Sequence, residues 1–193
     1  MKLKIEDFIP LRRFNFTHSI FIPMSRPHPS EYDSFYHHYI ELTHEVDAIL
    51  LPSTYSTSIV DFFKSLPPSK AAYAYAPDKW TLQQVLQHLI DVERVFVYRL
   101  LWIVRGDRQS LPGFSENAFA EKAPASHRSL QELNEEWLLL RGCTDRFVAQ
   151  LSQLELKESG TANGATITAN ALCFIIYGHI LHHMHIIESR YLK

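Results

Sequence analysis

Apolar residues recur every three or four positions in several long segments, which is the period of an α-helix with one buried face. The pattern from Glu31 to Leu51 predicts a first helix, and a shorter helical piece follows from Ser58 to Leu66, before Pro67 and Pro68. The apolar positions of that first segment are Tyr32, Phe35, Tyr39, Leu42, Val46 and Ile49.

The next helix has the clearest boundaries. Thr81 followed by Gln84 matches a capping box, and the segment runs to Gly106, a residue type that commonly follows a helix end. After a polar loop with Pro112, Gly113 and Pro124, a third long helix is predicted from Leu130 to Leu151, followed by a turn-rich gap at Gly160 to Gly164. A fourth starts near Thr166 to Thr168 and continues almost to Tyr191.

These segments predict an all-α domain. Four long amphipathic helices without a convincing alternating strand are typical of a four-helix bundle, which we expect to span residues 30–193. Residues 1–29 hold four prolines and no sustained period, so they predict an irregular N-terminal extension. Met24 is an alternative start of the chain under the same interpretation.

Charge and composition exclude several classes of function. The 193 residues carry 19 basic and 21 acidic side chains without long blocks, so no nucleic-acid-binding surface is predicted. No apolar run reaches the roughly 20 residues of a membrane span, and the first ten residues lack a signal-peptide core. We therefore expect a cytoplasmic protein, with Cys143 and Cys173 as small core residues in a reducing compartment.

Histidines supply the candidate chemistry. His179 and His183 are four residues apart on the predicted inner face of the fourth helix, in line with Leu172, Ile176 and Ile186. His88 lies on the predicted inner face of the second long helix, in line with Val85, Val92 and Val95. A bundle core is where facing helices build metal sites, and three protein ligands leave a fourth zinc position open. The alternative is that these are core histidines that hydrogen-bond to backbone or carboxylate groups.

Other polar residues are weaker candidates. His182 could replace a ligand or line the mouth of the site, and Asp91, three residues after His88, could orient a ligand ring. His185 is predicted to be solvated, and Glu93 to pair with a nearby arginine or another segment. Surface positions are predicted for His37, His38 and His44, and solvated positions for Glu135 and Glu136.

Competing catalytic motifs are missing from the sequence. It contains no GxSxG elbow, no phosphate-binding glycine loop and no CxxC pair. Serine hydrolase, nucleotide-binding and thioredoxin-like activities therefore lack the residues that they need.

Together, these motifs resemble the DinB-like superfamily over about residues 26 to 193. The resemblance rests on their order along the chain: a tryptophan before the capped helix, a histidine within it, and a distal HxxxH. The matching segments are Tyr75 to Arg94, Tyr98-Arg99, Arg105 to Asp107, Leu111 to Phe114, Gly178 to His183 and Arg190 to Leu192.

The resemblance implies an up-down-down-up four-helix bundle that often forms homodimers. It implies a divalent metal held by His88, His179 and His183. Characterised relatives include bacillithiol-dependent thiol transferases and a mycothiol-dependent isomerase, and the group is often described as metal-dependent hydrolases. One departure is Ile180, where relatives often carry an acid directly after the first histidine of the distal pair.

The sequence therefore predicts a metal-dependent hydrolase or thiol S-transferase acting on an electrophilic small molecule. Zinc or nickel is the expected ion, because imidazole suits several first-row metals, and a low-molecular-weight thiol is a possible second cofactor. Two alternatives remain open: a non-catalytic metal-binding bundle with a structural or stress-sensing role, and a histidine-rich helix pair without metal. No general base is identified.

Overall fold

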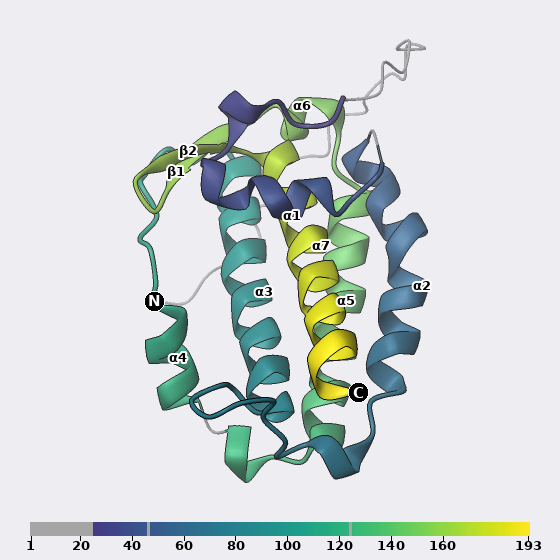
Figure 1. The fold of residues 1–193 in the computed structure, drawn as a ribbon. Coiled ribbons are helices and arrows are strands. Elements are labelled where there is room, and N and C mark those ends of the chain that lie inside the picture. The colour runs from purple at the N-terminus through teal and green to yellow at the C-terminus, as the bar shows by residue number, and fades with distance from the viewer. Residues whose placement is uncertain (1–24, 46, 124) are drawn as a thin grey trace, which may run out of the picture.

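Four long helices pack side by side in the computed structural model, which describes residues 25–45, 47–123 and 125–193. In Figure 1, α3 and α5 run in one direction and α2 and α7 in the other, and α3 and α5 are joined by a long crossover. This confirms the predicted up-down-down-up bundle. The four helices are α2 (Leu51–Lys64), α3 (Leu82–Val104), α5 (Leu130–Ala149) and α7 (Ala169–Ile186).

Local sequence signals set where the long helices begin. The Thr81 side chain accepts a hydrogen bond from the Gln84 backbone N–H, and the Gln84 side chain accepts one from the Thr81 N–H, which confirms the capping box of α3. Ser129 and Glu132 form the same box at α5. Thr168 caps α7 by accepting from the Ala171 N–H.

Helix α7 is the central element of the bundle. Every residue from Ala169 to Ile180 is buried, and α7 packs against α1, α2 and α3. A π-helical turn at Ile187–Tyr191, η7, continues it. Tyr191 then donates a hydrogen bond to the Trp80 carbonyl at 2.7 Å, which ties the end of the chain to the start of α3.

The predicted helix from Glu31 to Leu51 is wrong, because the described part of this segment forms short pieces. Arg26 donates hydrogen bonds to the Ile40 and Thr43 carbonyls at 2.6 and 2.7 Å, and such side-chain bonds compete with helix continuation. The predicted piece from Ser58 to Leu66 is the second half of α2. The short pieces are η2 (Pro29–Glu31), η3 (Ser34–Tyr36), α1 (His37–Glu41) and η4 (Ala48–Leu50), and η5 (Pro68–Lys70) follows α2.

A small β-hairpin corrects the prediction of a plain turn-rich gap. Strands β1 (Ser159–Ala162) and β2 (Ala165–Thr168) pair antiparallel, with Ser159 opposite Thr168. Asn163 and Gly164 join them at φ values of 52° and 78°, as a two-residue type I′ turn requires. Each strand is too short to show clear alternation. Further short helices are α4 (Glu116–Lys122), η6 (Ala125–His127) and α6 (Gln153–Leu156), and the first two lie in the predicted polar loop.

The structure also bears on the predictions for the two cysteines, the N-terminal extension and membrane-spanning helices. Cys173 is buried as predicted, but Cys143 is exposed on α5, so the prediction that it is a core residue is wrong. The predicted extension at residues 1–29 and the alternative start at Met24 fall almost entirely outside the described residues, and the domain boundaries stay a prediction. In the described chain, no helix is both long and apolar enough to cross a membrane.

Candidate metal centre

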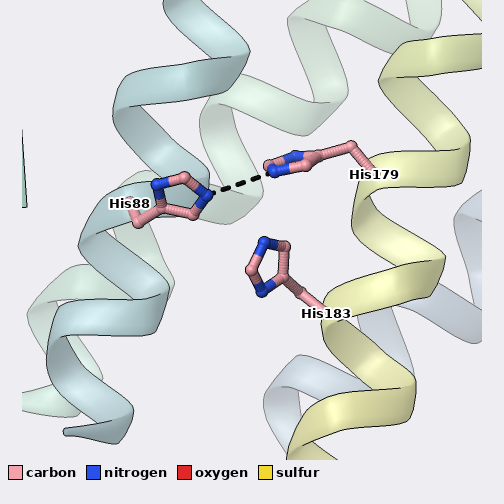
Figure 2. A group of neighbouring side chains, drawn as sticks. All are labelled: His88, His179 and His183. Carbon is pink, nitrogen blue, oxygen red and sulfur yellow. Dashed lines mark hydrogen bonds between the residues drawn. The ribbon is translucent and has the colours of Figure 1, made fainter. Parts of the chain in front are cut away.

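Three histidines from two helices meet in the bundle core. His88 of α3 faces His179 and His183 of α7, and the three rings point toward a common centre (Figure 2). Nε2 of His88 lies 3.2 Å from Nε2 of His179. Each ring offers one nitrogen, and these three nitrogens all lie within 4.8 Å of one another. The structure thus brings together the residues that the sequence pattern selected.

The arrangement has a simple origin in the two helices. Residues four apart share one helix face, and the ring centroids of His179 and His183 are 4.6 Å apart. The position of α3 sets the distance to His88. Trp80 packs against His88 with the rings tilted and their centroids 4.8 Å apart, and its carbonyl accepts the hydrogen bond from Tyr191. This contact fixes the start of α3 against the end of α7.

Helix α1 covers the histidine cluster because Gly178 lets it approach. A Cβ atom at position 178 would lie 1.9 Å from the Tyr39 carbonyl oxygen, so any larger residue would displace α1. The Tyr39 ring consequently lies 5.4 Å from that of His179, in an edge-to-face contact. Phe96 of α3 contacts the same imidazole at 5.8 Å. The cluster is therefore bounded by aromatic rings.

Burial keeps the three imidazoles neutral. Desolvation, with a smaller contribution from His182, lowers the pKa of His88 to about 4. Desolvation and then the neighbouring histidines hold the pKa values of His179 and His183 well below the ordinary value of 6.5. A neutral imidazole is the form that binds a metal, so no proton has to leave these rings near pH 7.

The donor set fits a divalent ion. Two nitrogens bound to one tetrahedral zinc at about 2.05 Å lie about 3.3 Å apart, close to the 3.2 Å between His88 and His179. That distance also suits an N–H···N hydrogen bond, but such a bond leaves His183 unexplained. Nδ1 of His183 is buried and has no hydrogen-bond partner in the described part of the chain. The fit to an ion therefore rests on three neutral imidazoles whose nitrogens lie within 4.8 Å of one another.

The other polar candidates near this centre are Asp91, His182 and His185, and each has a different environment. The Asp91 carboxylate accepts a hydrogen bond from the Gln87 side chain at 2.9 Å and lies 4.0 Å from a guanidinium nitrogen of Arg94, so neither partner is an imidazole. His182 packs edge-to-face against His183, with centroids 5.1 Å apart. His185 is exposed, as predicted. The role of Asp91 and His182 stays a prediction.

Most of the other polar residues lie as the sequence predicts, and Glu136 does not. His38 is exposed but lies 5.1 Å from His182, and Tyr39 is buried beside His179; the wrongly predicted long helix concealed this proximity. Glu93 pairs with Arg141 of α5, a neighbouring segment, and not with Arg94 or Arg99. Glu135 is exposed as predicted, whereas Glu136 is half-buried and pairs with Arg94 and Arg128.

The family acid is missing from the centre. Ile180 occupies the position after His179 and is buried. Among the described residues, no carboxylate oxygen forms a hydrogen bond or ion pair with any of the three rings. The described residues thus offer three neutral nitrogen ligands and an aromatic enclosure, with no carboxylate hydrogen-bonded to the rings.

Comparison with known proteins identifies the fold and the family. The chain is similar in structure to a solved protein from Bacillus subtilis, YfiT, described as "a probable metal-dependent hydrolase with an unusual four-helix bundle topology". The TM-score is 0.60 at 16% identity, over 86% of this chain and 91% of that one, and this similarity shows the fold. No curated protein matches the sequence significantly. The model of the DinB superfamily matches residues 57–187, and the chain therefore belongs to the DinB superfamily.

Proposed function

We propose that the protein is a metal-dependent hydrolase or thiol S-transferase whose divalent ion is held by His88, His179 and His183. The observation that carries the proposal is the convergence of three neutral imidazole nitrogens within 4.8 Å of one another. Burial of the rings, which keeps them in the neutral form that binds a metal, supports it. Zinc and nickel both accept imidazole ligands, and we propose one of them as the resident ion.

The protein's own residues would prepare the site in three ways. The two helices hold the imidazole rings in place, burial keeps them deprotonated, and Tyr39 and Phe96 limit the access of water. A divalent ion with three protein ligands and an open position would lower the pKa of a bound water or thiol and so supply a nucleophile near neutral pH. The substrate class that suits this chemistry is a small electrophile. A low-molecular-weight thiol would be the second reactant in the transferase case.

Metal analysis of the purified protein tests the ligand set. We expect about one ion per chain, and less than about a tenth of that after His88→Ala or His179→Ala. His185→Ala is the matched control, because it removes an exposed histidine from the same helix and should leave the metal content unchanged. Equal metal content in all four proteins would refute the site.

Activity is tested separately from metal content. The metal-loaded protein is incubated with a thiol and a panel of electrophiles, and with esters or amides alone. We expect turnover that disappears with EDTA and in His88→Ala. Product analysis separates hydrolysis from thiol transfer.

A second function is favoured by one observation. Ile180 stands where relatives often have an acid, and no carboxylate among the described residues forms a hydrogen bond or ion pair with the rings, which suits a non-catalytic metal-binding bundle. Metal bound at full stoichiometry without any metal-dependent turnover would support this role. Loss of the fold on metal removal would assign the ion a structural role.

For either function we propose a homodimer, which light scattering would test.

A further inference from the structure

A separate cavity of about 450 Å³ lies at the hairpin end of the bundle. Its walls come from η3, α3, the start of α4 and the β-hairpin, which lie near one another in Figure 1. None of the three clustered histidines is among the described residues that line it. Phe96 lies between the two places: its ring contacts Tyr36 of the cavity wall at 6.2 Å and His179 at 5.8 Å.

Arg99 is the unusual residue of this cavity. Its side chain lines the wall but is only 3% exposed. Nη2 donates one hydrogen bond to the Pro112 carbonyl at 2.8 Å, and the guanidinium carbon lies 5.6 Å from the centre of the Phe114 ring. Within the described residues, no carboxylate forms an ion pair with Arg99. Its charge is therefore desolvated without a compensating anion.

The other deeply buried arginine shows what such a charge normally requires. Arg141 is 1% exposed, and two carboxylates pair with it, those of Glu93 and Asp145. Burial of an ion is costly unless an opposite charge and hydrogen bonds offset the lost hydration. By this comparison, the cavity supplies the place where an anion would pair with Arg99.

Acidic groups limit the charge of that anion. Glu116 and Asp33 also line the cavity, and both are exposed, so they lie on its solvent side while Arg99 lies deep. The Asp33 carboxylate accepts a hydrogen bond from the Phe35 backbone N–H at 2.8 Å, which holds it in place. A ligand with a second negative charge near the opening would be repelled. Phe114, Ile167 and Leu172 give the intervening wall an apolar character.

We propose that this cavity binds a small organic molecule through a single carboxylate group, which pairs with Arg99, while an apolar body fills the rest. The planar guanidinium presents a fork of N–H donors that matches a carboxylate. The Tyr36 phenol is a further polar group on the wall; burial raises its pKa, the nearby Arg99 charge partly opposes this, and it stays protonated near pH 7. The site does not depend on the metal centre.

Calorimetric titration with benzoate and benzamide is the direct test. The two molecules have nearly the same shape, but only benzoate carries the charge. We expect benzoate to bind about tenfold to a hundredfold more tightly, because a hydrogen bond to a charged group discriminates by about that factor. Terephthalate and inorganic phosphate should bind more weakly than benzoate. Equal binding of benzoate and benzamide, or tighter binding of phosphate, would overturn the proposal.

Three variants locate the binding. Arg99→Gln should lose the preference for benzoate, while Arg105→Gln, which removes an exposed arginine paired with Glu155 at the end of the same helix, should not. Arg99→Gln also removes the hydrogen bond to Pro112, so its fold is checked by circular dichroism. Glu116→Gln leaves the Arg99 contacts intact and should improve terephthalate binding by about threefold to tenfold. If Glu116→Gln leaves terephthalate affinity unchanged, the ligand does not lie with one end at Arg99 and the other near Glu116, and that part of the proposal is wrong.

Metal removal separates this proposal from the proposed function. A carboxylate can also bind a metal ion, so the titrations are repeated after EDTA treatment and with His88→Ala. The cavity proposal expects unchanged benzoate affinity in both. Binding that disappears with the metal would place benzoate at the histidines, which would refute the cavity site and leave the metal site standing.

Discussion

Two clusters of polar side chains are buried in the same core, and they differ in how their polar atoms are satisfied. In the first, Arg141 donates to Glu93 at 2.9 Å, and Thr144 donates to the same carboxylate at 2.6 Å. Tyr177 donates to Asp145 at 2.6 Å, and Asp145 also pairs with Arg141. Among the described residues, only Nε of Arg141 lacks a partner in this network.

The histidine cluster is the second. One nitrogen–nitrogen contact at 3.2 Å links His88 to His179, and Nδ1 of His183 has no partner among the described residues. The first cluster pairs one guanidinium with two carboxylates, whereas the imidazoles of the second are neutral lone-pair donors directed at one point. The difference teaches that buried groups of opposite charge that pair with one another serve the fold, while neutral metal-binding groups that converge on one point mark where a ligand belongs.

The largest expected effect is in the ion-paired network around Arg141. Arg141→Met leaves the Glu93 carboxylate buried without its ion pair, and we expect a loss of about 3–5 kcal/mol in the free energy of unfolding. Urea denaturation followed by circular dichroism measures it. Arg146→Met on the same helix is the control, because Arg146 is exposed and its removal should change stability by no more than about 0.5 kcal/mol. Similar losses of unfolding free energy in both variants would show that the buried ion pair of Arg141 contributes no more to stability than an exposed arginine does.

Paired glycine substitutions probe the packing beside each cluster. Gly178→Ala places a Cβ atom 1.9 Å from the Tyr39 carbonyl oxygen, so α1 must move, at an expected cost of about 3 kcal/mol. Gly142→Ala, next to Arg141, has no atom within 4 Å of the new Cβ and should stabilise the helix by about 0.5–1 kcal/mol. Thermal unfolding of both variants checks the opposite signs. Two changes of the same sign would contradict the close α1–α7 approach.

Acid should weaken the metal-free protein through the histidine cluster. The pKa of His88 falls from 6.5 in the unfolded chain to about 4 in the folded one, so the unfolded state binds more protons in this window. The stability from its neutral form is complete above pH 6.5 and is lost progressively toward pH 4. We expect His88 alone to cost about 2 kcal/mol between about pH 7 and about pH 5. Urea titrations of the EDTA-treated protein measure the slope, which His88→Leu should flatten.

The smallest effect sharpens the comparison most directly. His183→Leu in the metal-free protein removes a buried polar atom that has no partner, so stability should stay constant or rise by up to about 1 kcal/mol. Thr144→Val, in contrast, removes a donor that Glu93 uses and should cost about 1–2 kcal/mol. Chemical denaturation compares the two. A large loss in His183→Leu would mean that the protein itself satisfies this ring.

Local signals were sufficient for most of the bundle. The Thr81–Gln84 capping box set the start of α3, and the helical period placed His88, His179 and His183 on inner faces, where the structure has them. Between Glu31 and Leu51 the same period failed, because Arg26 and Asp47 bind backbone groups that a continuous helix would use. Contacts between residues far apart in sequence decided that region.

The remaining site residues depend on such contacts as well. Nothing local distinguishes Arg99 from an exposed arginine or Arg141 from a solvated one, since burial depends on which helices cover them. Tyr39 reaches His179 only because Gly178 admits the α1 backbone. The sequence by itself determined the helix periods, their caps and the three histidines on inner faces, because these follow from chemistry within a few residues. The tertiary structure alone decided which polar groups are paired and which are left facing a cavity, because pairing depends on distances between segments that local periodicity does not encode.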